Sequence, residues 1–282
     1  MIFTLDIGGT YTKYAHIDNG KIISKGKWET TGDFQQIVEK IAGVIYRPVE
    51  YIGISSGGFW DKNGKSIGYE TVESTSENHL TKTLSGKFGC PVYIENDARC
   101  ALIAEKEYGV LKNRQNAVLF VLGSSLGCAV MINGKLYSGN TNQAGAMFMM
   151  PEYYDCSYYQ YDKWANSIAL TKDFDASLKR GDMLLLEEMA IQNNKKAEEL
   201  IERYAKTVAL KCWYTYLMYD PELIVLGGGI SNSKYISDRI KIHLKSFFES
   251  DKSKRTPLIV NARFGNDSNL LGAALLKEVF DK

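Results

Sequence analysis

Two segments of the chain repeat the same order of apolar and polar positions. In each, an apolar run leads into a Gly/Ser/Thr turn, a second apolar run and an Asn-Gly pair. Asn-Gly is a strong hairpin signal, because a type I′ turn needs positive φ at both central residues. The two segments match at a constant offset of 114 residues. The matching residues are Gly9, Thr10, Ala15, Asn19, Gly20 and Lys21 with Gly123, Ser124, Ala129, Asn133, Gly134 and Lys135. The pattern predicts two copies of one three-strand unit, with two unrelated hairpins as the alternative.

Helical and strand patterns alternate after each of these units. The predicted helices cover 33–46, 97–109, much of 182–218 and 270–280, and the predicted buried strands cover 51–58, 91–96 and 221–231. Such alternation after a hairpin-rich start is typical of an α/β fold, here with two similar lobes. The polar stretch 111–116 is the predicted boundary between them.

Composition and charge narrow the class of protein. The 282 residues are 45% hydrophobic and 24% charged, with a formal net charge of +1 and no Lys/Arg cluster, so we expect neither a nucleic-acid nor a membrane partner. No apolar run approaches the roughly 18 residues that span a bilayer, and the first residues lack the pattern of a signal peptide. The cysteines are scattered without a C-x-x-C pair, as is usual in reduced cytoplasmic proteins: Cys90, Cys100, Cys128, Cys156 and Cys212.

Three glycine-rich turns follow predicted strands. They are Asp6-Ile-Gly-Gly-Thr10, Leu122-Gly-Ser-Ser-Leu-Gly127 and Leu226-Gly-Gly-Gly-Ile230. Glycines let backbone N–H groups approach an anion closely, and the Ser and Thr hydroxyls add donors. None of the three matches a P-loop or a dinucleotide-binding fingerprint. Together they predict a phosphate site, although each turn alone could serve only to reverse the chain.

Two aspartates stand where chemistry could occur. Asp6 ends a buried strand beside a predicted phosphate turn, which suits a Mg²⁺ site reached through water, or simply a carboxylate that stabilises the turn. Asp97 begins a predicted helix, so it is either an N-cap or a general base for phosphoryl transfer. Asn96 beside it could orient the same hydroxyl. The histidines lack metal-ligand spacing.

Taken together, these motifs resemble the ROK family of sugar kinases and repressors, within the actin-like ATPase superfamily. The resemblance spans essentially the whole chain. Besides the three turns it includes Pro91-Val-Tyr-Ile-Glu-Asn-Asp97-Ala98, Gly134-Lys-Leu-Tyr-Ser-Gly139 and Gly265-Asn-Asp-Ser-Asn-Leu-Leu-Gly272.

The resemblance implies two actin-like (RNase H-like) lobes, each a mixed sheet flanked by helices, with ATP in the cleft between them. The N-terminal lobe would comprise 1–113 joined by the C-terminal helix 268–282, and the nucleotide-side lobe 114–267. Asp97 would be the catalytic base, with Asn96 and Gly58 near the sugar, and Asp6 would hold Mg²⁺. The residues implied to bind the nucleotide are Asp6, Gly8, Gly9, Thr10, Gly123, Ser124, Ser125, Gly127, Gly227, Gly228 and Gly229. A homodimer is also implied.

The chain departs from the family pattern after the second turn. Where family kinases carry Ala-Gly-Glu-x-Gly-His, this chain has Ala146 for the Glu and Met149 for the His, and the Cys-rich zinc loop is missing. We therefore expect no zinc. We also expect weaker binding of a bare hexose, because a hydrogen bond to a charged acceptor contributes roughly 1.5–3 kcal/mol. The run 147–150 could alternatively be ordinary core packing.

The zinc-less pattern most resembles β-glucoside kinases, which implies phosphorylation of a sugar 6-hydroxyl. N-acetylmannosamine kinase and glucokinase are the alternatives. A stacking wall for a second sugar, or a surface or dimer contact, could come from Tyr153, Tyr154, Tyr158, Tyr159, Tyr161 and Trp164. The rival class is a non-catalytic sugar or nucleotide sensor. A repressor would need a DNA-binding segment ahead of the first phosphate strand, which begins at residue 2, so we do not expect one.

Overall fold

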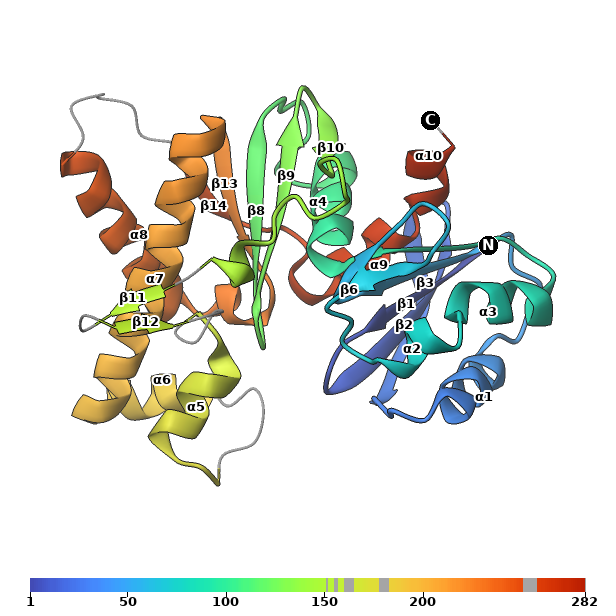
Figure 1. Ribbon diagram of the computed structural model, residues 1–282, viewed down its shortest axis with the longest axis horizontal. Coiled ribbons are helices and arrows are strands. Elements are labelled where there is room, and N and C mark those ends of the chain that lie inside the picture. The colour runs from blue at the N-terminus through green and yellow to red at the C-terminus, as the bar shows by residue number, and fades with distance from the viewer. Residues whose placement is uncertain (151, 155–156, 160–164, 178–182, 251–257, 282) are drawn as a thin grey trace. The chain divides into compact units, whose positions relative to one another are not determined.

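The computed structural model describes residues 1–150, 152–154, 157–159, 165–177, 183–250 and 258–281. The chain forms two compact units (Figure 1). Unit 1 comprises Met1–Glu107, Ser138–Gln143 and Asp267–Lys282, and unit 2 comprises Tyr108–Tyr137 and Ala144–Asn266. The lobes expected from the sequence, 1–113 with 268–282 and 114–267, remain a prediction. The compact units differ from them most clearly in assigning 138–143 to unit 1.

Unit 1 is built on a mixed five-stranded sheet in the order β3-β2-β1-β4-β7. The strands are β1 (Ile2–Ile7), β2 (Tyr11–Asp18), β3 (Lys21–Glu29), β4 (Ile52–Ser56) and β7 (Val92–Asn96). β1 runs antiparallel to β2 and parallel to β4, which is parallel to β7. The hairpin between β2 and β3 turns at Asn19 and Gly20, both at positive φ, as the Asn-Gly pair predicts.

Helices cover both faces of this sheet. α1 (Phe34–Val44) and α3 (Leu80–Phe88) bury their apolar residues against the face that carries Phe3, Leu5 and Ile7. α9 (Ser268–Ala273) packs on β1 and β4, and α4 (Asp97–Tyr108) packs against α9. The smaller elements are β5 (Phe59–Trp60), β6 (Ser66–Gly68), α2 (Ser74–Glu77) and α10 (Leu276–Phe280). The helix predicted over 270–280 is thus two short helices.

Unit 2 repeats the same sheet, in the order β10-β9-β8-β13-β14. Its strands are β8 (Ala117–Leu122), β9 (Leu126–Ile132), β10 (Lys135–Tyr137), β13 (Leu223–Gly227) and β14 (Leu258–Asn261). Strand order and directions match those of unit 1, with β8 antiparallel to β9 and parallel to β13. The predicted duplication and the predicted fold class of mixed sheets flanked by helices are therefore confirmed.

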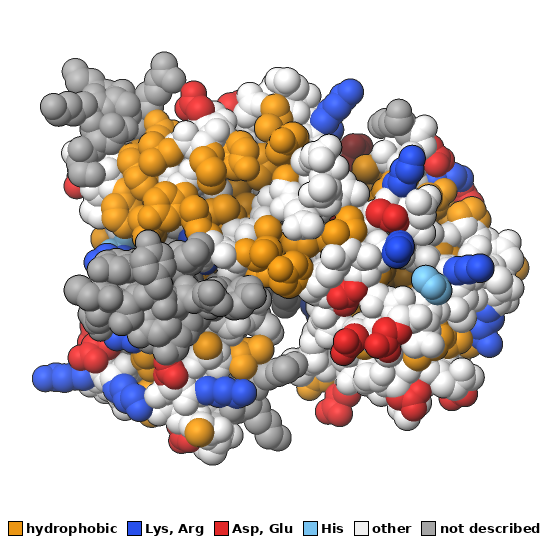
Figure 2. Space-filling view, in the orientation of Figure 1, with side chains coloured by type: hydrophobic (Ala, Val, Ile, Leu, Met, Phe, Trp, Pro, Cys, Tyr) orange, Lys and Arg blue, Asp and Glu red, His pale blue; other side chains and the backbone are white. Residues whose placement is uncertain are grey.

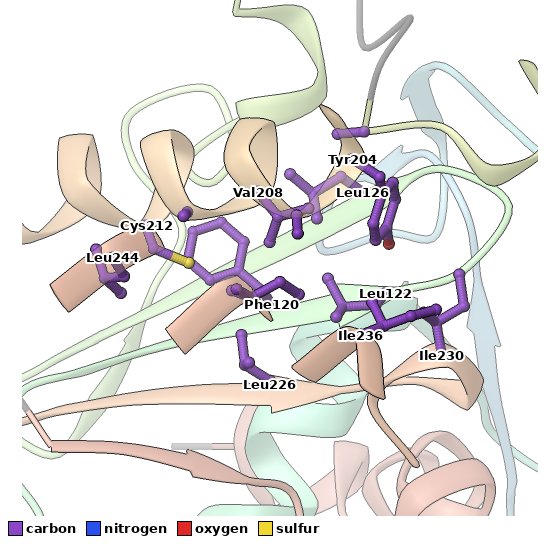
Figure 3. Close-up of a cluster of buried hydrophobic side chains, with 14 of the residues drawn as sticks. Phe120, Leu122, Leu126, Tyr204, Val208, Cys212, Leu226, Ile230, Ile236 and Leu244 are labelled. Carbon is purple, nitrogen blue, oxygen red and sulfur yellow. The ribbon is translucent and has the colours of Figure 1, made fainter. Parts of the chain in front are cut away.

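A large apolar core lies between the sheet of unit 2 and its helices (Figure 3). Phe120 and Leu226 project from the strands toward Val208 and Cys212 of α7 (Lys195–Tyr219) and toward Ile236 of α8 (Lys234–Ser250). The remaining elements are η1 (Met147–Met149), β11 (Glu152–Tyr154), β12 (Ser157–Tyr159), α5 (Ser167–Phe174), α6 (Met183–Ile191), η2 (Gly229–Asn232) and η3 (Gly265–Asp267). The strand predicted over 221–231 ends at Gly227.

Two glycines allow α9 to approach its neighbours at backbone distance. A Cβ on Gly272 would lie 1.8 Å from the carbonyl oxygen of Cys100 in α4, and one on Gly53 of β4 would lie 1.9 Å from that of Ala273. Both contacts are with backbone atoms, which a rotamer change cannot relieve. The end of the chain is thereby held against the strands and the helix that carry the candidate site.

We expect Gly272→Ala to destabilise the protein by about 1–3 kcal/mol or more, because α9 must move away from α4. Urea unfolding followed by circular dichroism measures this loss. The matched control is Gly86→Ala in α3, where a Cβ meets nothing within 4 Å. That helical substitution should raise stability by up to about 1 kcal/mol. Equal effects of the two variants would contradict the close-approach argument.

Candidate active site

The carboxyl ends of three parallel strands gather polar side chains at one edge of unit 1. Pairing sets Asp6 of β1 opposite Ser55 of β4, and Ser55 opposite Glu95 of β7. Ligands in α/β proteins bind beyond the carboxyl ends of such strands. The segments that follow here are the turn 8–10, the glycines 57–58 and the start of α4, each of which contains residues singled out from the sequence.

The turn between β1 and β2 is held at its base and open at its tip. Gly8 donates its N–H to the carbonyl of Tyr11 (3.2 Å). Thr30 also holds the turn in place. Its hydroxyl donates to the carbonyl of Gly8 (2.7 Å), and its N–H donates to the carbonyl of Thr10 (3.0 Å). Gly9 and Thr10 are exposed. This arrangement presents the tip of the turn to a ligand without requiring the strands to move.

Asp6 is a buried carboxylate with three donors around it. Its Oδ1 accepts from the Ser55 hydroxyl (3.0 Å) and from Nδ2 of Asn269 (2.9 Å), and its Oδ2 lies 3.3 Å from Nζ of Lys13. Asp6 is only 6% exposed, so its orientation is well determined. Carboxylates bind Mg²⁺ through one oxygen and retain waters on the ion. Asp6 is also near enough to Asp97 for its charge to raise the pKa of that carboxyl. The carboxylate oxygens of these two residues fit a hydrated magnesium ion.

Sequence reasoning missed Lys13 and Asn269. A signal for Lys13 was present, because a hairpin with a two-residue loop at Gly9 and Thr10 pairs residue 6 with residue 13, and the register does so. Asn269 had no such local signal, since it reaches Asp6 only through the packing of α9 on the sheet. Lys13 places a positive charge at the predicted phosphate turn.

Two adjacent residues could cap α4, and the hydrogen bonds show which of them does. Asn96 caps α4, since its Oδ1 accepts from the N–H groups of Ala98 (3.0 Å) and Arg99 (3.3 Å). Its Nδ2 donates to the carbonyl of Gly58 (2.9 Å), which adopts φ +93°. Asp97 lies one residue inside the helix, and its Oδ1 accepts from Ala98 N–H (2.8 Å). The interpretation of Asp97 as the N-cap is therefore wrong by one residue.

Burial and a neighbouring negative charge act on Asp97. Desolvation, followed by the charge of Asp6, raises the pKa of Asp97 to about 6, and hydrogen bonds from the helix N-terminus lower it only in part. A carboxylate with a pKa near the working pH is a better proton acceptor than one with the ordinary value of 3.8. Such perturbation by burial plus a specific charge is common at active sites.

A buried ion pair links α4 to residues 138–142. Arg99 is 1% exposed and Glu95 is 5% exposed, and their side chains lie 3.3 Å apart. The guanidinium also donates to the carbonyls of Asn142 (2.8 Å) and Ser138 (3.4 Å). Asn142 in turn donates to the carbonyl of Trp60 (3.3 Å). Arg99 therefore ties three separate segments of unit 1 together two residues from Asp97.

Unit 2 contains a cavity of about 660 Å³, a size typical of small-molecule sites. It lies where β8 and β13 end and where α8 begins, with Ser233 capping that helix through the N–H of Ile236 (3.0 Å). Its lining residues are Leu122, Gly123, Ser124, Ser167, Met183, Leu184, Glu187, Gly229, Ile230, Asn232, Ser233 and Lys234. Three of the residues predicted to bind nucleotide, Gly123, Ser124 and Gly229, come together here.

The other predicted residues of unit 2 lie elsewhere. Ser125 is exposed at the tip of the β8–β9 turn, Gly127 lies within β9 and Gly227 within β13. Gly228, at φ +82°, packs on the backbone of Leu122, where a Cβ would lie 2.4 Å from the carbonyl oxygen. Gly228 thus shapes the turn. Ser167 and Lys234 line the cavity but belong to helices that carry no glycine motif, which is why sequence reasoning missed them.

The segment that departs from the family motif joins the core of unit 2. Gly145, at φ +90°, packs against the carbonyl of Cys128, and Met147 is 8% exposed within the apolar cluster. Buried Lys211 of α7 donates to the carbonyl of Met147 (3.1 Å). For Met147, the core-packing alternative is confirmed. The aromatic wall suggested at 153–164 lies outside the residues whose side chains are described.

Within the described part of the chain, no three His, Cys, Asp or Glu side chains are grouped so as to hold a metal ion. None of the helices described there is both long and apolar enough to cross a bilayer.

The chain belongs to the ROK family, whose pattern it matches over residues 2–279. It is 30% identical to an N-acetylmannosamine kinase of Vibrio cholerae, with 96% of each chain covered. It is 26% identical to an N-acetyl-D-glucosamine kinase of Vibrio cholerae (98% of this chain, 99% of the relative) and 26% identical to a β-glucoside kinase of Listeria monocytogenes (96% and 95%). The fold matches a ROK family glucokinase from Streptomyces griseus in complex with glucose and AMPPNP, with a TM-score of 0.82 at 22% identity and 98% of each chain covered.

These findings confirm the predicted family. The predicted class of enzyme, an ATP-dependent carbohydrate kinase, agrees with the activities named for all of these relatives.

Proposed function

We propose that the protein transfers the γ-phosphoryl group of ATP to a hydroxyl of an uncharged hexose or amino sugar. The observation that carries the proposal is Asp97, a half-buried carboxylate at the start of α4 whose pKa is raised to about 6. It stands in the same unit as the open turn 8–10 and as Asp6. Membership of the ROK family and the kinase relatives support the same activity.

In the proposed reaction, Asp97 accepts the proton of the sugar hydroxyl as its oxygen attacks the γ-phosphorus. The bond from that phosphorus to the bridging oxygen of ADP breaks, and ADP leaves with the bonding electrons. Asn96 holds the N-terminus of α4, and with it Asp97, in a defined position. Asp6 would hold hydrated Mg²⁺, which supplies positive charge to the phosphates, and Lys13 adds a fixed positive charge beside it.

The nucleoside of ATP is proposed to bind in the cavity of unit 2. The volume of about 660 Å³ suits a ligand of this size, and the lining combines apolar side chains with hydroxyls and backbone amides. Gly123 and Ser124 on one side and Gly229 on the other are the predicted contacts. The turn 8–10 of unit 1 is proposed to contact phosphates.

We also propose which sugar accepts the phosphoryl group. The resemblance of the zinc-less motif supports a β-glucoside phosphorylated at its 6-hydroxyl, as does one relative at 26% identity. N-acetylmannosamine and N-acetylglucosamine kinases are at least as similar to this chain, so these amino sugars, with glucose, are the competing acceptors. In all cases Ala146 cannot supply the charged acceptor that family kinases place there.

The experiment is ADP release from ATP and Mg²⁺ over a panel of cellobiose, aryl β-glucosides, glucose, N-acetylmannosamine and N-acetylglucosamine. We expect turnover with one member of this panel well above the rate without sugar. ATP binding without turnover on any sugar would overturn the kinase proposal and favour the sensor, which the loss of the usual Glu and His motivates. Product analysis by NMR identifies the phosphorylated hydroxyl.

A homodimer is proposed as well. Hydrophobic side chains gather on one face of unit 2 (Figure 2), and the exposed apolar residues of this unit include Leu217 and Met218 at the end of α7, each more than half exposed. A second copy of the chain would bury them.

A further inference from the structure

The segment that follows β6 is held in an unusual backbone conformation next to the candidate acceptor site. Tyr69 adopts φ +66°, which is rare for a bulky side chain. Residues in such conformations are strained and concentrate at functional sites. Tyr69 and Glu70 have no part in the activity proposed above.

Packing places this segment against the residues that position Asp97. A Cβ on Gly58 would lie 2.9 Å from both N and Cα of Glu70 and 3.0 Å from the carbonyl carbon of Tyr69. The carbonyl of Gly58 accepts from Asn96, which caps the helix that Asp97 begins. On the neighbouring Gly57, a Cβ would lie 2.0 Å from the Thr71 hydroxyl. Residues 69–71 therefore lie directly over the two glycines, one contact away from the catalytic helix.

The side chains of this segment are oriented by their neighbours. The Ser66 hydroxyl donates to Oε1 of Glu70 and accepts from Gly68 N–H (2.9 Å), so the carboxylate is tethered through one oxygen. The Tyr69 ring stands edge-on to Phe59, with centroids 6.4 Å apart at 86°, and Tyr69 is 48% exposed while Phe59 is 3% exposed. Unit 1 thus presents an anchored carboxylate and an aromatic ring in the segment that packs on Gly57 and Gly58.

We infer that Tyr69 and Glu70 recognise the acceptor sugar in unit 1. Glu70 accepts hydrogen bonds from adjacent hydroxyls through the oxygen that Ser66 does not hold, and the Tyr69 ring packs on an apolar face of the sugar ring. The inference rests on the proposed function and deepens it. It selects uncharged acceptors with neighbouring hydroxyls, because Asp6, Asp97 and Glu70 together repel a sugar acid.

The test compares Glu70→Gln with Glu73→Gln in steady-state kinetics on the sugar that the wild-type protein phosphorylates. Glu73 is exposed, three residues away in the same segment, and assigned no role. We expect Glu70→Gln to raise the KM for the sugar by at least about tenfold. The KM for ATP and the thermal midpoint should stay at the values of the Glu73→Gln protein. A structural role alone would not separate the two substrates.

A second pair of variants tests the ring. Asn tolerates positive φ better than most residues, so Tyr69→Asn keeps the backbone conformation and removes the ring, whereas Tyr69→Phe keeps both. We expect the KM for the sugar to rise about threefold or more in Tyr69→Asn and to stay near wild type in Tyr69→Phe. This pair also decides the question if Glu70→Gln fails to fold.

The outcomes distinguish the role of Tyr69 and Glu70 from the proposed kinase activity. Wild-type turnover with equal sugar KM values in the Glu70 and Glu73 variants would overturn this inference and leave the kinase proposal standing. If the wild-type protein phosphorylates no sugar, the proposed function is overturned, and the inference with it.

Discussion

Replacement of Asp97 by Asn should lower kcat by about 10²–10⁴-fold while ATP binding stays intact. The amide is nearly isosteric but cannot accept a proton, so the sugar hydroxyl would attack without a base. Asn96 still caps α4, and we therefore expect the fold to be unchanged. Rapid-quench measurement of sugar phosphate formation gives the rate of the chemical step. Asp18→Asn, at an exposed position at the end of β2, is the matched control and should leave kcat unchanged.

The same variant has a predicted effect on stability. The pKa of Asp97 is about 6 in the folded protein and near 3.8 when the chain is unfolded, so the folded state binds the proton more tightly. Asp97 therefore favours folding when protonated, and this contribution fades as the pH rises from about 4 through 6. At pH 7 its charge opposes folding, and Asp97→Asn should stabilise the protein by about 1–3 kcal/mol.

The pH dependence of activity follows from the same pKa. Protonated Asp97 cannot act as a base, so kcat/KM should fall as the pH is lowered through about 6. A wild-type profile that stays flat down to pH 5, or residual activity above one tenth in Asp97→Asn, would contradict the assignment of Asp97 as the base.

Replacement of Arg99 by Met should destabilise the protein by about 3–5 kcal/mol. The change leaves the Glu95 carboxylate buried without its counter-ion and removes the donor from the carbonyls of Ser138 and Asn142. Burial already raises the pKa of Glu95, and the Arg99 charge opposes that rise. Urea unfolding measured at pH 7 reports the free energy. Activity should fall as well, since Arg99 lies in the first turn of the helix that carries Asp97.

Two further variants identify the cause of the loss. The double variant Glu95→Gln/Arg99→Met should lose less stability than Arg99→Met alone, because no unpaired charge is then buried. The exposed pair Lys245 and Glu249 has the same i,i+4 spacing, with side chains 74% and 67% exposed. Lys245→Met should therefore change stability by no more than about 0.5 kcal/mol. Losses of stability of similar size in the Arg99 and Lys245 variants would contradict a stabilising role for the buried ion pair of Arg99 and Glu95.

Local patterns were sufficient to predict much of the fold. Asn-Gly pairs specify hairpins because few other residues adopt left-handed φ, and Asn19, Gly20, Asn133 and Gly134 all do so. Apolar runs between turn residues predicted the strands of both sheets, and the repeated turns predicted that the second sheet copies the first. The boundaries were less certain, because side-chain capping decides them. Asn96 rather than Asp97 caps α4 for that reason.

The duplicated α/β architecture, the glycine turns and the two aspartates could be predicted, because each depends on residues close together along the chain. The groups that surround those aspartates come instead from distant parts of the chain. Asn269 reaches Asp6 across 263 positions, Arg99 binds carbonyls near residue 140, and Glu70 lies over Gly58. Such contacts arise from the packing of separate elements, where a single buried hydrogen bond or close backbone approach selects the partner. No periodicity along the chain encodes that choice.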